Sequence, residues 1–311
     1  YSIGFDVTGK NKIDDDNLKY GIWGPQNPLL AYAYVQDRFE LEDMVLNLGI
    51  RFDYFDTQAK ILKDKTLPFA GGSNPFDYDL GDFKTKATEF HVSPRIGIGF
   101  PISANTVFHA QYGKFIQQPP LNIVYSPISH LQFLISDNNW EVITGDVESE
   151  ITTQYEVGFR QVIGNIAALN VSAFYKNTKG LINDSPVFFQ RTPGGQRLIY
   201  FTPSNSDFGT IKGFSLSLDV ARVSYFSFSA DYTLSFADGT GSSTSSSLVA
   251  AFRNQNGEVP KVIAPLDFDQ RHTGIINVDF TVPKGELGIF EMFSANVLFR
   301  FNSGRPYTPL Q

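Results

Sequence analysis

The residues that could bind a metal ion are four histidines and a run of three aspartates, Asp14, Asp15 and Asp16. The histidines have neither His-x-His nor His-Glu-x-x-His spacing, the arrangements that place two imidazoles on one metal ion. The aspartates offer hard oxygens suited to Ca²⁺, but no EF-hand loop with its glycine and closing glutamate follows them. We therefore expect hydrogen bonding by His91 and His109, a solvated acidic loop at the aspartates, and no metal or other cofactor.

Covalent catalysis has little support in this sequence. The chain has no cysteine, so neither a thiolate nucleophile nor a disulfide framework is available. The serines lack a nucleophile elbow with a partner histidine, and no glycine-rich loop opens a helix that could hold a phosphate. The net charge of −7 opposes a nucleic-acid partner, because phosphates require a basic surface. We expect a protein that is not an enzyme.

The elements that would position side chains are long strands with one apolar face. In residues 224–237 every second residue is apolar: Phe226, Phe228, Ala230, Tyr232, Leu234 and Phe236. The residues between them are small or polar, and side chains of a strand alternate between its two faces. Such a length is unusual for a soluble strand and suits one that crosses a bilayer at a tilt. No run approaches 18 apolar residues, so no transmembrane helix is expected.

The same alternation recurs along the chain and predicts an all-β protein of about eleven antiparallel strands. The expected strands are 1–7, 30–41, 44–55, 88–100, 106–116, 150–162, 166–177, 208–221, 224–237, 268–282 and 291–302. Tight turns are expected near 42, 103, 164, 222 and 285. Long connections are expected at 10–29, 56–86, 118–148, 178–206 and 238–266. The connection 178–206 could contain its own hairpin, Val187–Gln190 with Leu198–Phe201. Short turns at one end and long loops at the other are typical of an antiparallel transmembrane β-barrel.

Charged residues fall mostly on the face opposite the apolar series, which we assign to the lumen of such a barrel. Asp37 is an exception that shares a face with Val35 and Phe39, and we place it near the periplasmic rim. The candidate lumen contacts are Arg51, Arg95, Glu156, Arg160, Asp267, Asp269, Arg271 and Arg300. Among residues 267–271, a cross-strand charge network that stiffens the wall is favoured over contact with a ligand.

Aromatic residues in the long connections are candidate ligand contacts. They are Tyr125, Phe133, Trp140, Phe188, Phe189 and Tyr200. Their rings offer stacking platforms, but they could equally pack the loops against one another, and both interpretations stay open. A second aromatic set is expected in an interfacial belt near the loops. It comprises Tyr54, Phe55, Tyr112, Phe115 and Tyr175.

Six segments resemble the barrel of TonB-dependent outer-membrane receptors. They are Ala33–Phe39, Ser93–Gly97, Tyr112–Pro120, Gln154–Arg160, Leu266–His272 and Ser303–Pro309. Their order and spacing over nearly the whole chain carry the resemblance. It implies about 22 strands around an N-terminal plug domain, and TonB-energised uptake of a large scarce nutrient through the outer membrane of a Gram-negative bacterium. The candidate lumen residues are then also candidate plug contacts.

The sequence shows no plug domain, no TonB-contacting box and no closing strand with an aromatic terminus. We therefore expect an internal segment of a longer receptor. The implied partners are outer-membrane lipid, the receptor's own plug, the TonB complex and an unidentified nutrient. Two other classes stay open, a passive outer-membrane channel without TonB coupling and a soluble β-rich adhesin or surface structural protein.

Overall fold

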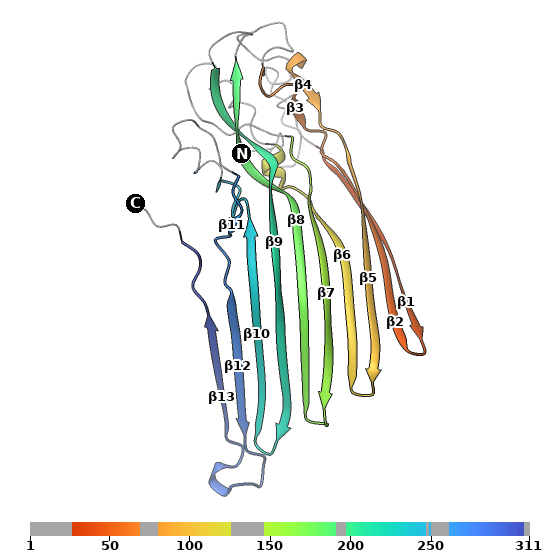
Figure 1. The fold of residues 1–311 in the computed structure, drawn as a ribbon, viewed down its shortest axis with the longest axis vertical. Coiled ribbons are helices and arrows are strands. Elements are labelled where there is room, and N and C mark those ends of the chain that lie inside the picture. Colours follow the sequence, from red (N-terminus) through yellow and green to blue (C-terminus); the bar gives the residue numbers. More distant parts are fainter. Residues whose placement is uncertain are drawn as a thin grey trace, which may run out of the picture.

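A single antiparallel sheet forms most of the protein. The computed structural model describes residues 27–68, 80–125, 146–190, 197–246, 249 and 261–307. Ten strands lie side by side in chain order (Figure 1). They are β1 (Leu29–Leu41), β2 (Met44–Asp56), β5 (Glu89–Ser103), β6 (Thr106–Gln117), β7 (Glu150–Ile163), β8 (Ala167–Gln190), β9 (Arg197–Val223), β10 (Phe226–Gly239), β12 (His272–Thr281) and β13 (Ser294–Asn302). We call these strands the wall.

Short elements complete the described structure. Strand β11 (Ala264–Pro265) pairs with β10 and makes the sheet 11-stranded, while β3 (Lys60–Leu62) and β4 (Phe83–Thr85) form a separate ribbon. Helix α1 (Leu121–Val124) and the 3₁₀ turns η2 (Leu80–Asp82) and η3 (Gly288–Phe290) are each about one turn long. None of the helices in these ranges has the length and apolarity that crossing a membrane requires. The strand expected at 1–7 and the aspartates at 14–16 lie outside the described residues.

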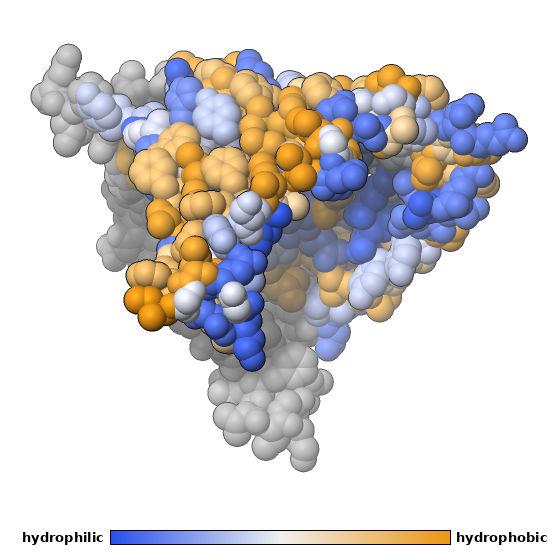
Figure 2. All heavy atoms as spheres, turned by 90° about the horizontal axis from the view of Figure 1, so that it is seen from below, coloured by the Kyte–Doolittle hydropathy of each residue, from blue (hydrophilic) through white to orange (hydrophobic). Residues whose placement is uncertain are grey.

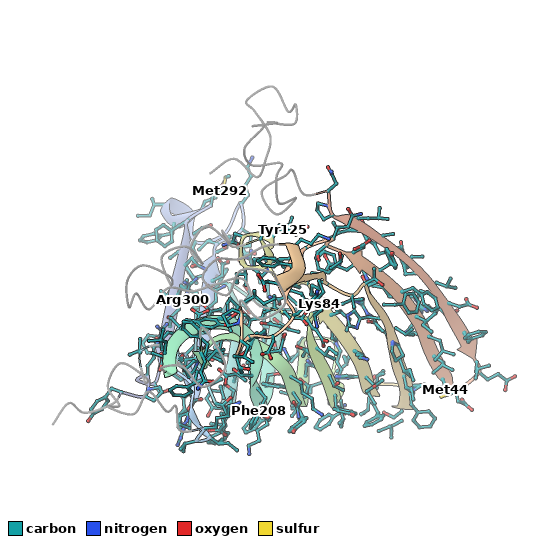
Figure 3. All side chains as sticks on the ribbon, turned by 90° about the horizontal axis from the view of Figure 1, so that it is seen from above. Met44, Lys84, Tyr125, Phe208, Met292 and Arg300 are labelled. Atoms are coloured by element: carbon teal, nitrogen blue, oxygen red, sulfur yellow. The ribbon has the colours of Figure 1, made fainter. Side chains whose placement is uncertain are left out.

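Several strand predictions are confirmed almost to the residue. Strands β1, β2, β6 and β7 match the expected ranges to within one residue at each end. The tight turns near 42, 103, 164 and 222 are also present, since each joins two adjacent paired strands. The wall bends into an open arc with β1 and β13 at its edges, as Figure 3 shows from above.

The prediction of a connection at 178–206 is wrong, because residues 178–190 belong to strand β8 and residues 197–206 to strand β9. Strands β8 and β9 stay paired as far as Gln190 and Arg197, beyond the end of the neighbouring wall. The pairing slips at Leu181, beside Gly180 with its positive φ of 72°. Bulges of this kind let Gly, Asn and Pro lie in a ladder that they would otherwise end. The small hairpin expected near Phe189 and Leu198 is therefore confirmed as the tip of a longer one.

Two predictions near the C-terminal end of the wall are also wrong. Strand β12 begins only at His272, because a turn closed by the Asp269 amide on the Leu266 carbonyl (2.7 Å) precedes it. The connection between Thr281 and Ser294 contains η3 and is not a tight turn. Pro283 lacks the amide hydrogen needed to continue β12, so the chain leaves the sheet there.

The wall has one apolar face and one polar face, as the alternation predicts. Phe228 lies opposite Val220 and Val278, whereas the next residue, Ser229, lies opposite Asp219 and Asn277. Seen from below, hydrophobic residues follow the outer side of the arc and hydrophilic residues gather in its hollow (Figure 2). A cluster of buried apolar side chains lies under the loops and contains Ala59, Val124, Val147 and Ile182.

Two of the residues expected in the aromatic belt, Tyr112 and Tyr175, lie on the outer face. The rings of Tyr112, Tyr155 and Tyr175 form a row, with centroids 5.2 Å and 6.4 Å apart. Phe55 and Phe115 lie on the opposite face, in register with Glu89 and beside Arg95, so their assignment to the belt is wrong. Asp37 does share the apolar face, where it pairs with Leu48.

Candidate functional site

Five of the charged residues predicted for the lumen lie on the polar, concave face of the wall. They are Arg51, Arg95, Glu156, Arg160 and Arg300. These residues belong to β2, β5, β7 and β13, and the pairing of each strand with its neighbours places them on the same face. The alternation of side chains along each strand predicted this face correctly, because regular pairing keeps the alternation in step from one strand to the next. What each residue contacts depends on its neighbours across the strands.

Arginine side chains on β2 and β5 are held by carboxylate and aromatic partners. The Arg51 guanidinium contacts the Asp53 carboxylate at 2.8 Å and stacks over the Tyr32 ring at 4.9 Å. The Arg95 guanidinium lies 4.8 Å from the centre of the Phe115 ring. A planar guanidinium over an aromatic face gains cation–π attraction and stays oriented. Both arginines therefore present fixed donors along the concave face.

The centre of the wall carries a histidine and a carboxylate. His109 Nε2 lies 3.9 Å from a Glu156 carboxylate oxygen, and the Gln154 amide donates to the other oxygen at 3.4 Å. A recess of about 610 Å³ beside them is lined by polar residues such as Arg95 and Gln111 together with glycines and apolar residues of β2, β5 and β6. Within the described ranges, no three His, Asp or Glu side chains converge as a metal site would require. The groups can form hydrogen bonds and ion pairs.

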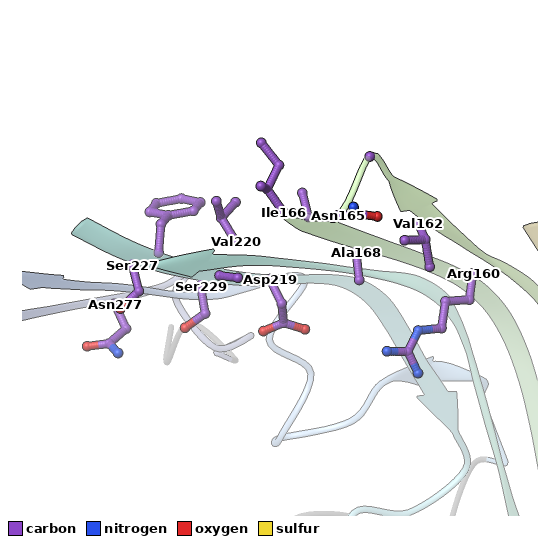
Figure 4. A pocket seen from close by; sticks show the side chains of 14 residues that line it. Arg160, Val162, Asn165, Ile166, Ala168, Asp219, Val220, Ser227, Ser229 and Asn277 are labelled. Atoms are coloured by element: carbon purple, nitrogen blue, oxygen red, sulfur yellow. The ribbon is translucent and has the colours of Figure 1, made fainter. Parts of the chain in front are cut away.

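Arg160 marks a second recess, of about 580 Å³, at the turn end of the wall. Figure 4 shows Arg160, Asp219 and Ser229 directed to the concave side, while Ile166 points the other way. The recess therefore offers donors and acceptors of both charges, but no nucleophile paired with a base. Arg300 is more isolated, since its partner across the ladder on the same face is the apolar Ile275.

A buried carboxylate ties two loops to the wall at the loop end of β5. Glu89 Oε1 accepts a hydrogen bond from the Lys86 ammonium at 2.6 Å, and Oε2 accepts one from the Ser149 amide at 2.9 Å and contacts His91 Nε2 at 3.0 Å. Burial opposes the charged form of Glu89, but these hydrogen bonds outweigh it and lower its pKa to about 2. Lys86 and Ser149, which the sequence did not single out, belong to the loops after β4 and before β7.

The three charged residues at 267–271 precede β12, so the alternation of side chains along a strand does not determine which way they point. The Asp269 carboxylate is buried and accepts the Ala237 amide at 3.0 Å. Arg271 contacts Asp269 at 3.4 Å and covers the Phe236 ring at 5.3 Å. The Asp267 amide donates to the Ser242 hydroxyl at 2.9 Å. These contacts attach the segment to β10 and to the following loop.

The aromatic residues for which ligand contact and loop packing both stayed open pack the loops together wherever the structure describes their contacts. Phe189 and Tyr200 are fully buried with ring centroids 5.3 Å apart, and the Tyr200 hydroxyl donates to the Lys65 carbonyl at 2.8 Å. Burial raises the pKa of Tyr200, so its hydroxyl stays a neutral donor. The Tyr125 hydroxyl donates to the Thr57 carbonyl at 2.5 Å, and burial raises its pKa as well. Both Tyr125 and Lys84 lie within the arc in Figure 3.

Phe188 continues the hairpin opposite Ile199, and Phe133 and Trp140 lie outside the described residues.

A cluster of hydrogen bonds around Asp207 was not predicted. The Asp207 carboxylate accepts hydrogen bonds from the Asn183 amide and, at 2.9 Å, from the Thr240 hydroxyl. It joins the β8–β9 hairpin to the connection after β10. Its only sequence signal is Gly241, where a Cβ atom would overlap the Asp207 carboxylate.

Comparison with known proteins places this architecture in a family. Comparison with the curated proteins gave no match. The FrpB iron transporter from Neisseria meningitidis has a similar structure, with a TM-score of 0.51 at 13% identity over 83% of this chain and 31% of its own. The copper transporter OprC gives 0.50 at 14% identity, over 88% and 34%. The chain thus spans about a third of the length of these structures. A family model for the TonB-dependent receptor-like β-barrel matches residues 4–311. The chain belongs to the TonB-dependent receptor β-barrel family.

Proposed function

We propose that the chain forms part of the wall of an outer-membrane receptor that imports a large, scarce nutrient with energy delivered by TonB. The observation that carries the proposal is the concave face, where Arg51, Asp53, Arg95 and Glu156 place charged side chains of both signs. Such a wall can hold a folded plug through many ion pairs and hydrogen bonds. An open pore selective for one type of ion would instead favour rings of a single charge.

The loop end supports the same proposal. The hydroxyl contacts of Tyr200 with Lys65 and of Tyr125 with Thr57 bring the β8–β9 hairpin and the β6–β7 connection against the β2–β5 connection and form one cap. A cap of this kind narrows access to the concave face and suits selective capture better than free diffusion. FrpB and OprC are described as an iron and a copper transporter, so metal-containing cargo is the first substrate class to test.

The test uses the full-length receptor expressed in a host that lacks its gene. Uptake of radiolabelled iron and copper, free and as chelates, is measured with and without a protonophore and with and without TonB. We expect receptor-dependent uptake of one cargo that stops when either the proton gradient or TonB is removed. Uptake that continues without both would identify a passive channel. Recovery of the receptor outside the outer-membrane fraction would contradict the assignment to that membrane.

A further inference from the structure

The connection between β12 and β13, residues 282–293, is a protrusion with internal hydrogen bonds at the turn end of the wall. Its base is closed by two hydrogen bonds between Val282 and the chain at Phe293 and Met292, at 2.9 Å and 3.1 Å. The Glu291 amide donates to the Gly288 carbonyl at 3.0 Å within it. The other turns at this end join their strands directly, and Figure 1 shows this one reaching furthest from the loops.

The protrusion presents its apolar side chains outward. The exposed fractions are 54% for Leu287, 94% for Ile289, 58% for Phe290, 70% for Met292 and 51% for Phe293. Contiguous exposed apolar side chains are uncommon on a surface that meets only water, and they mark contact with a membrane or another protein. The nearby charged residues, Lys284, Glu286 and Glu291, leave the apolar group uninterrupted from 287 to 290.

The backbone is strained where it turns these side chains outward. Leu287 and Met292 have φ values of 54° and 62°, in the left-handed region that side chains with a Cβ atom disfavour. Gly285 and Gly288 share the positive φ without that penalty. Two strained apolar residues flanking one turn show that the exposed arrangement is specified by the structure, and such outliers point to a function.

The protrusion is continuous with the outer, apolar face of the wall. The Phe293 ring contacts the Phe280 ring at 6.2 Å, and Phe280 contacts Phe226 at 4.9 Å. Phe280 and Phe226 face each other in the β10–β12 register, on the face that also carries Phe228. The Tyr225 ring of the neighbouring turn also contacts the Phe280 ring, at 6.0 Å between centroids. These contacts attach the protrusion to the lipid-facing row.

We propose that residues 287–293 insert into the phospholipid headgroup and upper acyl region of the periplasmic leaflet and anchor the β12–β13 hairpin there. Burial of the five apolar side chains in that layer removes their contact with water, while Lys284 and Glu286 stay at the polar level. The proposal depends on the wall spanning the membrane and is independent of the transported nutrient. It assigns a lipid contact to a connection whose counterparts are simple turns.

The test measures the depth of a label in the full-length receptor reconstituted into phosphatidylethanolamine and phosphatidylglycerol vesicles. The described chain has no cysteine, so Ile289→Cys carries an environment-sensitive fluorophore after any cysteine elsewhere is removed. Ala104→Cys, in the tight β5–β6 turn at the same end, is the matched control. Phe228→Cys, on the outer face of β10 near its turn end, reports insertion of the wall. Quenching by brominated lipid chains is compared with quenching by aqueous iodide.

We expect the label at 289 to be quenched by brominated lipid, protected from iodide and blue-shifted relative to the label at 104. Met292→Cys should behave like Ile289→Cys and guards against a local failure at one site. The proposal is overturned if the label at 289 matches the label at 104, because the protrusion then lies in water. Protection from both quenchers also overturns it, since a protein surface would then cover the site. Quenching of the label at 228 shows that the wall is inserted in either case.

Discussion

Neighbouring residues of one strand meet opposite surroundings in this wall. Phe228 faces Val220 and Val278 on the apolar side, and Ser229 faces Asp219 and Asn277 on the concave side. Phe228→Arg should destabilise the receptor, by less than the roughly 2–4 kcal/mol of a midplane site, because a charged side chain then faces lipid near the turn end of β10. Ser229→Arg should be tolerated, since Asp219 lies beside it. Reversible folding of the full-length receptor into lipid vesicles measures both, and equal penalties would contradict the register.

Glu89 attaches two loops to the loop end of the wall through Lys86 and Ser149. It lies above the roughly 9–11 residues of β5 that a spanning strand needs. Because the pKa of Glu89 in the folded protein, about 2, is below its ordinary value, the contribution of Glu89 to the free energy of unfolding is present near neutral pH. It is lost as the pH falls from the ordinary carboxylate range through the folded pKa. Glu89→Gln removes the charge at every pH and leaves the buried Lys86 ammonium unpaired, a change that typically costs about 3–5 kcal/mol.

We therefore expect Glu89→Gln to expose the Ser149 amide, which donates to Glu89 in the wild type. Hydrogen–deuterium exchange of the peptide around Ser149 measures this release. The matched control is Glu148→Gln at an exposed site one residue away, which should leave exchange unchanged. Unaltered protection of Ser149 in Glu89→Gln would show that the surrounding packing alone holds this loop.

At the scale of elements, the β8–β9 hairpin depends on a close approach at Gly241. The Asp207 carboxylate lies against this glycine, and the Asp184 amide donates to the Thr244 carbonyl at 2.7 Å. Gly241→Ala places a methyl group in the space of the carboxylate, and overpacking of this kind typically costs about 1–3 kcal/mol. Faster hydrogen exchange at Asp184 is the expected result. Gly304→Ala, where nothing lies near the added carbon, should have no such effect.

Local alternation predicted the wall strands because each strand needs only its own apolar face. The same information placed Arg51 and Arg95 on the concave face correctly. The extended β8–β9 hairpin was not predictable in this way, because its ladder passes through bulges near Gly180 and Leu181. The contacts of its aromatic residues were also hidden, since the Tyr200 hydroxyl meets a carbonyl 135 residues away in the chain.

At the scale of the whole molecule, the two ends of the wall differ in kind. One end carries the β3–β4 ribbon, α1 and the β8–β9 hairpin, tied together by Glu89, Tyr200 and Asp207. The other end carries tight turns and the protrusion at 282–293. Long connections concentrate binding function, whereas tight turns serve to reverse the chain. The end with long connections should therefore face the extracellular medium, and the end with turns should face the periplasm.

Epitope tags inserted at opposite ends of the wall test this orientation in living cells. Ser245 is exposed in the connection after β10, close to Gly241 but outside the Asp207 contacts, so it can accept an insertion without breaking them. Gly164, with a φ of 56° and open space around it, lies in the β7–β8 turn. A tag after Ser245 should bind antibody on intact cells, and a tag after Gly164 should bind only after the outer membrane is permeabilised. Labelling of the Gly164 tag alone on intact cells would invert the topology and move the proposed lipid contact to the outer leaflet.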